Sequence, residues 1–335
     1  MNESNPEIAP LESTAKPYQD RSTGLTIFGI LTIMMGCLAA LLIPLMLFSQ
    51  MMAAKTTGAP ANFSTILPVI LVYGLLAVAL VWLGIGSIQA RRWARALLLI
   101  FSWSWLVTGL IAVVSMAVIM PKMMANLSSG GKSGSPAMPS SALAAVMIFM
   151  FVFYGVLFVI LPAIWTFFYH SRHVKATCEA RDPVTRWTDA CPLPVLALCL
   201  WLLFAVPMLL LMPIASHGVM PFFGLLLTGL PGTLLCLAIA ALWIFAAGLL
   251  YKLDVRGWWL IFIVMAAFMA SALLTFAHHD ILEMYQLMGY SEAQIELMKK
   301  SGLLEGNRMN WLMSLSVVPF LGYLLFIKKY LGRKA

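Results

Sequence analysis

LAVALVWLGIGSIQARRWARALLLIF, residues 76–101, decides the fold, because two apolar runs in it flank a short turn that carries three arginines. A spanning helix needs about 20 mostly apolar residues to cross roughly 30 Å of hydrocarbon. Both runs continue outward to that length, from Ile66 to Ala90 before the turn and from Ala96 to Met120 after it. The stretch therefore predicts two membrane-spanning helices joined at a basic turn.

Six more apolar runs of similar length occur along the chain. They are Leu25 to Phe48, Leu143 to Tyr169, Leu193 to Ala215, Phe222 to Leu250, Trp258 to Ala277 and Trp311 to Ile327. Transmembrane strands would show alternating segments of about ten residues, whereas these runs are longer and apolar throughout. With 62% hydrophobic and 10% charged residues among 335, the sequence predicts an all-α integral membrane protein with eight transmembrane helices.

Lysine and arginine are distributed unevenly between the two sides of the predicted spans. Of the 21 in the chain, 15 fall in the amino-terminal tail, the second, fourth and sixth connections, and the carboxy-terminal tail. Cytoplasmic loops accumulate these residues, so both termini are predicted to be cytoplasmic. The net charge of +8 is thus a topology signal that suits an anionic inner leaflet. It gives no reason to expect nucleic acid as a partner.

Residues 76–101 also resemble residues 237–262, LAIAALWIFAAGLLYKLDVRGWWLIF, at a shift of 161 positions. The identical pairs are Leu76/Leu237, Ala77/Ala238, Ala79/Ala240, Trp82/Trp243, Arg95/Arg256, Leu99/Leu260, Ile100/Ile261 and Phe101/Phe262. Two four-helix units are the plan that these matches favour. Since four is even, both units enter the membrane the same way round, which predicts two parallel four-helix repeats.

The predicted organisation follows from the repeats and the polar segments between them. In chain order it comprises a disordered cytoplasmic tail (1–24), the first four-helix repeat (25–169), a cytoplasmic linker (170–192), the second four-helix repeat (193–327) and a basic cytoplasmic tail (328–335). Short external helices are expected at about residues 280–302, since Ser291 and Gln294 make a capping box there. Short loops around a methionine-rich apolar bundle are typical of the bacterial inner (plasma) membrane.

The linker between the repeats holds charges of both signs at high density. Mixed signs indicate an internally paired, folded connector that braces the two repeats. Docking of a cytoplasmic partner or of lipid headgroups is the alternative. The cations available for such a contact are Arg172, Lys175, Arg181 and Arg186.

The predicted spans contain no lysine, arginine, aspartate or glutamate. Because proton relays, ion coupling and voltage sensing rely on ionisable groups inside spans, the sequence argues against these functions. It likewise indicates no catalytic residues, no cofactor and no haem, since every histidine lies outside the spans or at their edges. The one open metal question is His278, His279 and Glu283, where the last two have the spacing of metal ligands on a helix.

A few side chains inside the spans are candidates for lining a cavity. Trp82 and Trp243 lie about ten residues before their basic turns, roughly 15 Å into the membrane, where an indole either packs between helices or faces a ligand. The hydroxyls of Ser102, Ser104 and Thr108 lie within a short stretch of the third span. They either bond between helices or line a small polar cavity for a neutral ligand.

We therefore expect a non-catalytic polytopic membrane protein, an accessory or scaffold subunit that binds partner helices and lipid. Its partners are then membrane lipids and other membrane subunits or further copies of itself. The alternative is a facilitator or carrier for a neutral or lipid-like small molecule, favoured by the parallel repeat and by proline-kinked helices. A lipid-modifying enzyme ranks third, because its acids and histidines would come only from loops.

Overall fold

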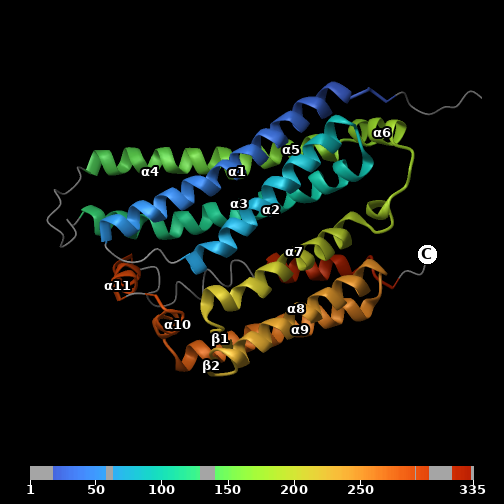
Figure 1. The fold of residues 1–335 in the computed structure, drawn as a ribbon. Coiled ribbons are helices and arrows are strands. Elements are labelled where there is room, and N and C mark those ends of the chain that lie inside the picture. Colours follow the sequence, from blue (N-terminus) through green and yellow to red (C-terminus); the bar gives the residue numbers. More distant parts are fainter. Residues whose placement is uncertain (1–17, 58–62, 129–139, 291, 302–318, 333–335) are drawn as a thin grey trace, which may run out of the picture.

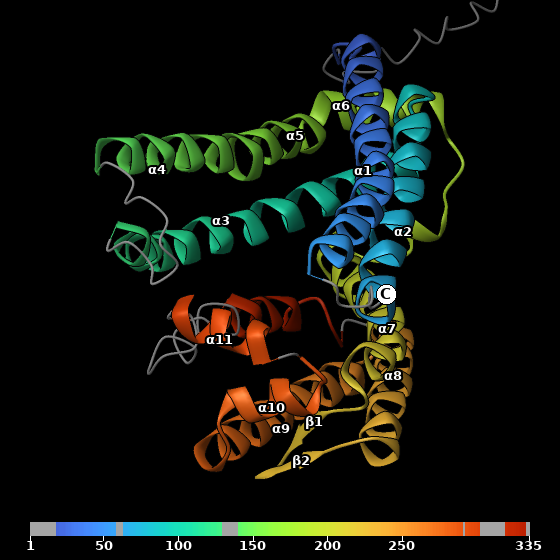
Figure 2. The same cartoon turned by 60° about the vertical axis from the view of Figure 1, so that its left-hand side comes forward.

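The computed structural model describes residues 18–57, 63–128, 140–290, 292–301 and 319–332. Within these ranges, seven helices are long and apolar enough to cross a membrane. By the length and composition of its helices, the chain is an all-α membrane protein. Figure 2 shows α1, α2, α7 and α8 in one layer, with α3, α4–α5 and α9 on one side of it.

The long helices correspond to the first seven predicted runs. They are α1 (Ser22–Thr57), α2 (Phe63–Ile88), α3 (Arg92–Ser128), the continuous α4 (Ser140–Gly155), η1 (Val156–Ile160) and α5 (Leu161–His170), α7 (Leu193–Ser216), α8 (Leu230–Tyr251) and α9 (Val255–His278). The shorter ones are α6 (Arg172–Arg181), η2 (Trp187–Asp189), α10 (Ile281–Leu287), α11 (Glu292–Ser301) and the helix Pro319–Lys328. The first part of the eighth predicted span, residues 311–318, lies outside the described residues, as do residues 1–17 of the predicted tail.

Glycines bring α1 and α2 into close contact. A Cβ added at Gly29 would lie 2.8 Å from the carbonyl oxygen of Gly84, and one added at Gly84 would lie 2.7 Å from that of Gly29. Gly36 meets Val81 and the Ala77 carbonyl in the same way. Small residues of this kind let transmembrane helices associate by close packing of their backbones.

The fourth span is interrupted by the π-helical segment η1. Pro162 has no N–H to donate to the carbonyl of Phe158, so the regular helical ladder cannot continue there. On α3, a Cβ at Gly109 would overlap the Phe158 carbonyl oxygen. Glycine at this position therefore permits the close approach of α3 to the fourth span.

The turns α2–α3 and α8–α9 share one backbone geometry. Ala90 and Leu253 both have positive φ, 51° and 58°. The next residue in each turn donates its N–H five positions back, from Arg91 to Gly86 at 2.9 Å and from Asp254 to Leu249 at 3.0 Å. This is a helix C-cap of the Schellman type. Ala90 and Leu253 are 163 positions apart, two more than the spacing of the sequence matches.

The fifth connection is a small hairpin of β1 (Met220–Phe222) and β2 (Leu225–Leu227). The prediction that the sixth span begins at Phe222 is therefore wrong at its start, because α8 begins only at Leu230. Two hydroxyls of α9 hold the hairpin: Ser271 accepts from the Phe223 N–H at 2.9 Å, and Thr275 accepts from the Gly224 N–H at 3.1 Å. These tertiary bonds compete with helix formation in an apolar stretch.

Candidate functional site

Five segments gather at one end of the helices, on the right in Figure 1: residues 19–21, 89–92, 171–192, 251–254 and 328–332. We call them the basic end. Hydrogen bonds join them across long stretches of sequence. Tyr251 donates its hydroxyl to the Trp187 carbonyl at 2.9 Å, and the Gly332 N–H donates to the Leu253 carbonyl at 3.2 Å.

Much of the linker is an ordered helix, α6. Ser171 caps it by accepting from the His173 N–H at 3.3 Å, and Val174, Thr177 and Cys178 are buried on one face. The Arg21 N–H donates to the Thr177 hydroxyl at 3.1 Å. Residues just before α1 are thus held against α6, and α1 begins at Ser22 inside the range predicted to be a disordered tail. The sequence signal for this helix is a serine cap followed by Val174 and Cys178, four residues apart and so on one face.

Asp182 joins three parts of the basic end. It is 2% exposed and accepts from the backbone N–H of Arg92, the first residue of α3, at 3.3 Å. The Arg91 and Arg186 side chains each lie 3.7 Å from its carboxylate oxygens. One buried carboxylate therefore caps α3 and ties the end of α6 to the first basic turn.

A second group of charges lies beside Asp182. Arg92 contacts Glu179 at 3.8 Å and Asp189 at 3.5 Å, and Lys175 contacts Glu179 at 3.8 Å. Ion pairs at or near the surface stabilise a fold by at most about 1 kcal/mol each. Their value here is to fix where the linker lies.

Three of the four predicted contact cations are engaged within the chain. Lys175 and Arg186 pair as described above, and Arg181 lies 3.3 Å from Asp20. Among the described residues, Arg172 makes no ion pair. The structure thus brings the linker cations together with acids, which leaves fewer charges for an external partner than their number implies.

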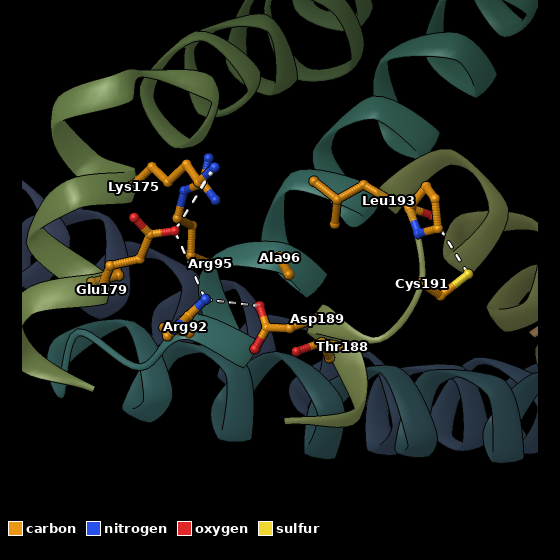
Figure 3. Close-up of a pocket in the computed structure, with 11 residues that line it drawn as sticks. Arg92, Arg95, Ala96, Lys175, Glu179, Thr188, Asp189, Cys191 and Leu193 are labelled. Atoms are coloured by element: carbon orange, nitrogen blue, oxygen red, sulfur yellow. Dashed lines mark hydrogen bonds and ion pairs between the residues drawn. The ribbon is translucent and has the colours of Figure 1, made fainter. Parts of the chain in front are cut away.

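A cavity of about 330 Å³ opens between the first turns of α3, α6, η2 and the start of α7. Figure 3 shows the charged residues on one side of it and Cys191 with Leu193 on the other. Its polar lining comprises Arg92, Arg95, Lys175, Glu179, Thr188 and Asp189. This volume is at the lower end of the range of small-molecule sites.

The two cysteines beside this cavity are free thiols. Burial raises the pKa of Cys178 to about 11, partly opposed by Arg95, and burial also raises the pKa of Cys191 to about 11. Both are therefore protonated at neutral pH. Since the thiolate is the nucleophile and metal ligand, neither is poised for chemistry.

The tryptophans matched by the repeat lie in different surroundings. Trp82 is 52% exposed and stacks on Trp93 at 4.1 Å between ring centroids. It lines a shallow apolar groove between α1 and α2. Trp243 packs against the core that α7, α8 and α9 form.

The three hydroxyls of the third span do not converge. Ser102 is buried and donates to the Leu99 carbonyl at 3.0 Å, whereas Thr108 is exposed. Ser104 accepts from the indole N–H of Trp201 on α7 at 2.8 Å. It therefore bonds one half of the chain to the other.

His279 Nδ1 lies 2.9 Å from Glu283 Oε2, and His278 Nδ1 lies 2.9 Å from the Leu274 carbonyl. The two rings thus have different partners. Within the described residues, no group of three or more histidine, cysteine, aspartate or glutamate side chains is placed to hold a metal ion.

No protein-family model, curated protein or solved structure matches this chain.

Proposed function

We propose that the protein is a non-catalytic accessory or scaffold subunit of a membrane, binding partner helices and lipid through its apolar faces. The observation that carries this proposal is the exposure of the apolar side chains in the fourth span. No residue of the most apolar 18-residue stretch within residues 144–170 is buried. The end of the span is buried at Pro162, Trp165, Thr166 and Tyr169. The part before it packs so little against its own chain that its surface is open to other helices and to lipid.

The contacts of α4 support this assignment. Its one contact cluster with α3 is built on methionines, with Met120 of α3 buried beside Met116, Met147 and Met150. Methionine fills irregular gaps and adapts to different neighbours. On the rest of α4, the side chains that face outward are large and apolar, Phe149 among them at 65% exposed.

Polar groups of the spans, including Tyr169 at the end of the fourth, are used mainly inside the chain. Tyr169 and Ser87 share a buried hydrogen bond of 2.7 Å, and Ser87 donates to the Leu25 carbonyl at 3.0 Å. Ser271 and Thr275 hold the hairpin. Side chains that already form hydrogen bonds within the chain supply no polar lining for a transport path, which favours a scaffold over a carrier.

The same proposal includes the arrangement of the chain in the membrane. We propose that the protein has eight spans in two parallel four-helix repeats, has both termini in the cytoplasm and lies in a bacterial inner membrane. The gathering of five basic segments at one end supports the orientation, and the shared turn geometry supports the repeat. Reporter fusions at Gly130 and Arg181 are expected to fall on opposite sides of the membrane, and the same side for both would refute this topology.

The scaffold role is tested by purification in mild detergent and by site-specific crosslinking. A photo-crosslinking residue at Phe149 is expected to capture a stoichiometric partner helix or a second copy. The same residue at Ile244, an exposed apolar position on α8, is the control and is expected to capture none. Equal capture at both sites would remove the α4 face from the proposal, and a lone monomer that conducts a solute would remove the scaffold role.

The alternative role, a carrier of a neutral or lipid-like molecule, is favoured by one feature, the apolar groove beside Trp82. Flux into proteoliposomes measures it. Trp82→Ala is expected to change flux and Trp243→Ala to leave it unchanged, because only Trp82 lines that groove. Unchanged flux in both variants would exclude the groove as a transport path.

A further inference from the structure

The cavity at the basic end contains a cation that the chain leaves unpaired. Arg92 and Lys175 share Glu179, and Arg92 also meets Asp189. The Arg95 side chain, by contrast, makes no ion pair or hydrogen bond among the described residues, and its Nε atom is buried without a partner. Three cations and two carboxylates line the cavity, so one positive charge remains uncompensated.

Thr188 adds a second unpartnered donor. It is 2% exposed, it lines the same cavity, and its Oγ1 atom has no hydrogen-bond partner within the described chain. A buried polar group left without a partner costs about 1–3 kcal/mol. Two such groups at one cavity indicate that something outside the chain satisfies them.

The start of α7 provides a further positive pole. This 24-residue helix begins at Leu193, and no side chain of the described residues caps it. Pro192 and Leu193 both line the cavity. Uncapped helix N-termini carry free N–H groups and favour anions.

We propose that this cavity binds a phosphate group, with the Arg95 guanidinium and the Thr188 hydroxyl donating hydrogen bonds to its oxygens. Phosphate matches the planar donors of arginine, and its charge balances the unpaired cation. The group is carried by an anionic lipid headgroup or by free phosphate, and both present the same oxygens. For a lipid, the inference deepens the lipid-binding part of the proposed function and rests on it; for free phosphate it stands alone.

The test uses the full-length protein in nanodiscs. In one arm, inorganic phosphate is titrated calorimetrically into protein in phosphatidylcholine nanodiscs. In the other, the discs also contain phosphatidic acid, and native mass spectrometry measures the lipid retained by the protein. Saturable binding in the first arm assigns free phosphate, and retention of phosphatidic acid alone assigns the headgroup.

Two variants each remove one of the proposed phosphate donors. Arg95→Gln is expected to weaken binding at least about tenfold, since it removes a charged hydrogen bond, and Thr188→Val about fivefold, since it removes a neutral one. Arg256→Gln is the control. Arg256 is the arginine that the sequence repeat matches to Arg95, and it is exposed and lies outside the cavity. It is expected to bind as the unmodified protein does.

Failure of the unmodified protein to bind either probe overturns the inference, as does unchanged binding in both Arg95→Gln and Thr188→Val. Should Arg95→Gln fail to fold, the nearly isosteric Thr188→Val decides alone. The scaffold proposal is judged separately by crosslinking at Phe149. A protein that binds phosphate but captures no partner would therefore lose its scaffold role and keep this site.

Discussion

The two basic turns have the same backbone and different surroundings. At the α2–α3 turn, Arg91 and Arg92 contact three carboxylates of the linker. At the α8–α9 end, Lys328 lies over the rings of Trp258 and Trp259, at 4.7 and 5.3 Å from their centroids. No ion pair joins Lys252 or Arg256 to another described residue.

The difference follows from where the linker folds. After α5 the chain turns at Ser171 and continues as α6 beside the start of α3. The linker acids therefore reach the arginines of the first turn. Asp254 is the one acid at the second turn, and it caps α9 by accepting from the Arg256 N–H at 2.9 Å. Two basic turns with the same backbone thus form a closed, ion-paired surface with a cavity at one turn and an open cationic surface at the other.

Thiol labelling tests this contrast most strongly. Cys178 lies under the first turn with its pKa raised to about 11, whereas Lys252→Cys places an exposed thiol at the second. With an ordinary thiol pKa of about 8.5, the introduced cysteine is expected to react with maleimide on the order of a hundredfold faster at neutral pH. Mass spectrometry of the labelled protein measures both rates.

The direction of the pH dependence provides a control on that result. The labelling rate of Cys178 is expected to rise about tenfold per pH unit until the pH approaches 11, because only the thiolate reacts. The introduced cysteine is expected to level off well before that. Equal rates at neutral pH would show that the first turn is as open as the second.

Asp182→Asn is the next largest test. The amide keeps the shape and can still accept from Arg92, but it loses both arginine contacts, so the free energy of unfolding is expected to fall by about 1.5–3 kcal/mol. Asp254→Asn is the matched control at the second turn and is expected to change little, since asparagine caps helices as well as aspartate does. Denaturant unfolding in micelles measures both, and equal losses would remove the distinction between the turns.

Lys328→Met probes the aromatic contacts at the second turn. The loss of a cation over two indole rings is expected to cost about 0.5–1 kcal/mol at this exposed site. Lys252→Met, which removes an exposed cation with no ring contact among the described residues, is the control and should cost less. A Lys328→Met variant as stable as the Lys252→Met variant would show that the rings do not hold this cation.

Much of the fold could be predicted from sequence, since span length and composition are local properties. The candidate site was harder to predict from the sequence. Arg95 reads as an ordinary turn arginine, and its burial depends on α6 and η2 folding over α3 from some 80 residues away. The hydroxyls of the third span differ in surroundings for a simpler reason: Ser102 and Ser104 are two positions apart, and such residues point to different faces of a helix.

The smallest expected effect concerns the exposed pair of Arg181 and Asp20. The pKa of Asp20 is lowered chiefly by the backbone N–H of Ser22 and further by Arg181. A carboxylate with a lowered pKa stabilises the fold above its ordinary pKa, and this contribution is lost as the pH falls through the lowered value. Arg181→Gln is expected to raise that pKa part of the way back, because the bond from Ser22 remains. Carboxyl ¹³C shifts followed between pH 2 and 6 measure it. A full return to the ordinary value would mean that the ion pair, rather than the cap of α1, holds this carboxylate at the basic end.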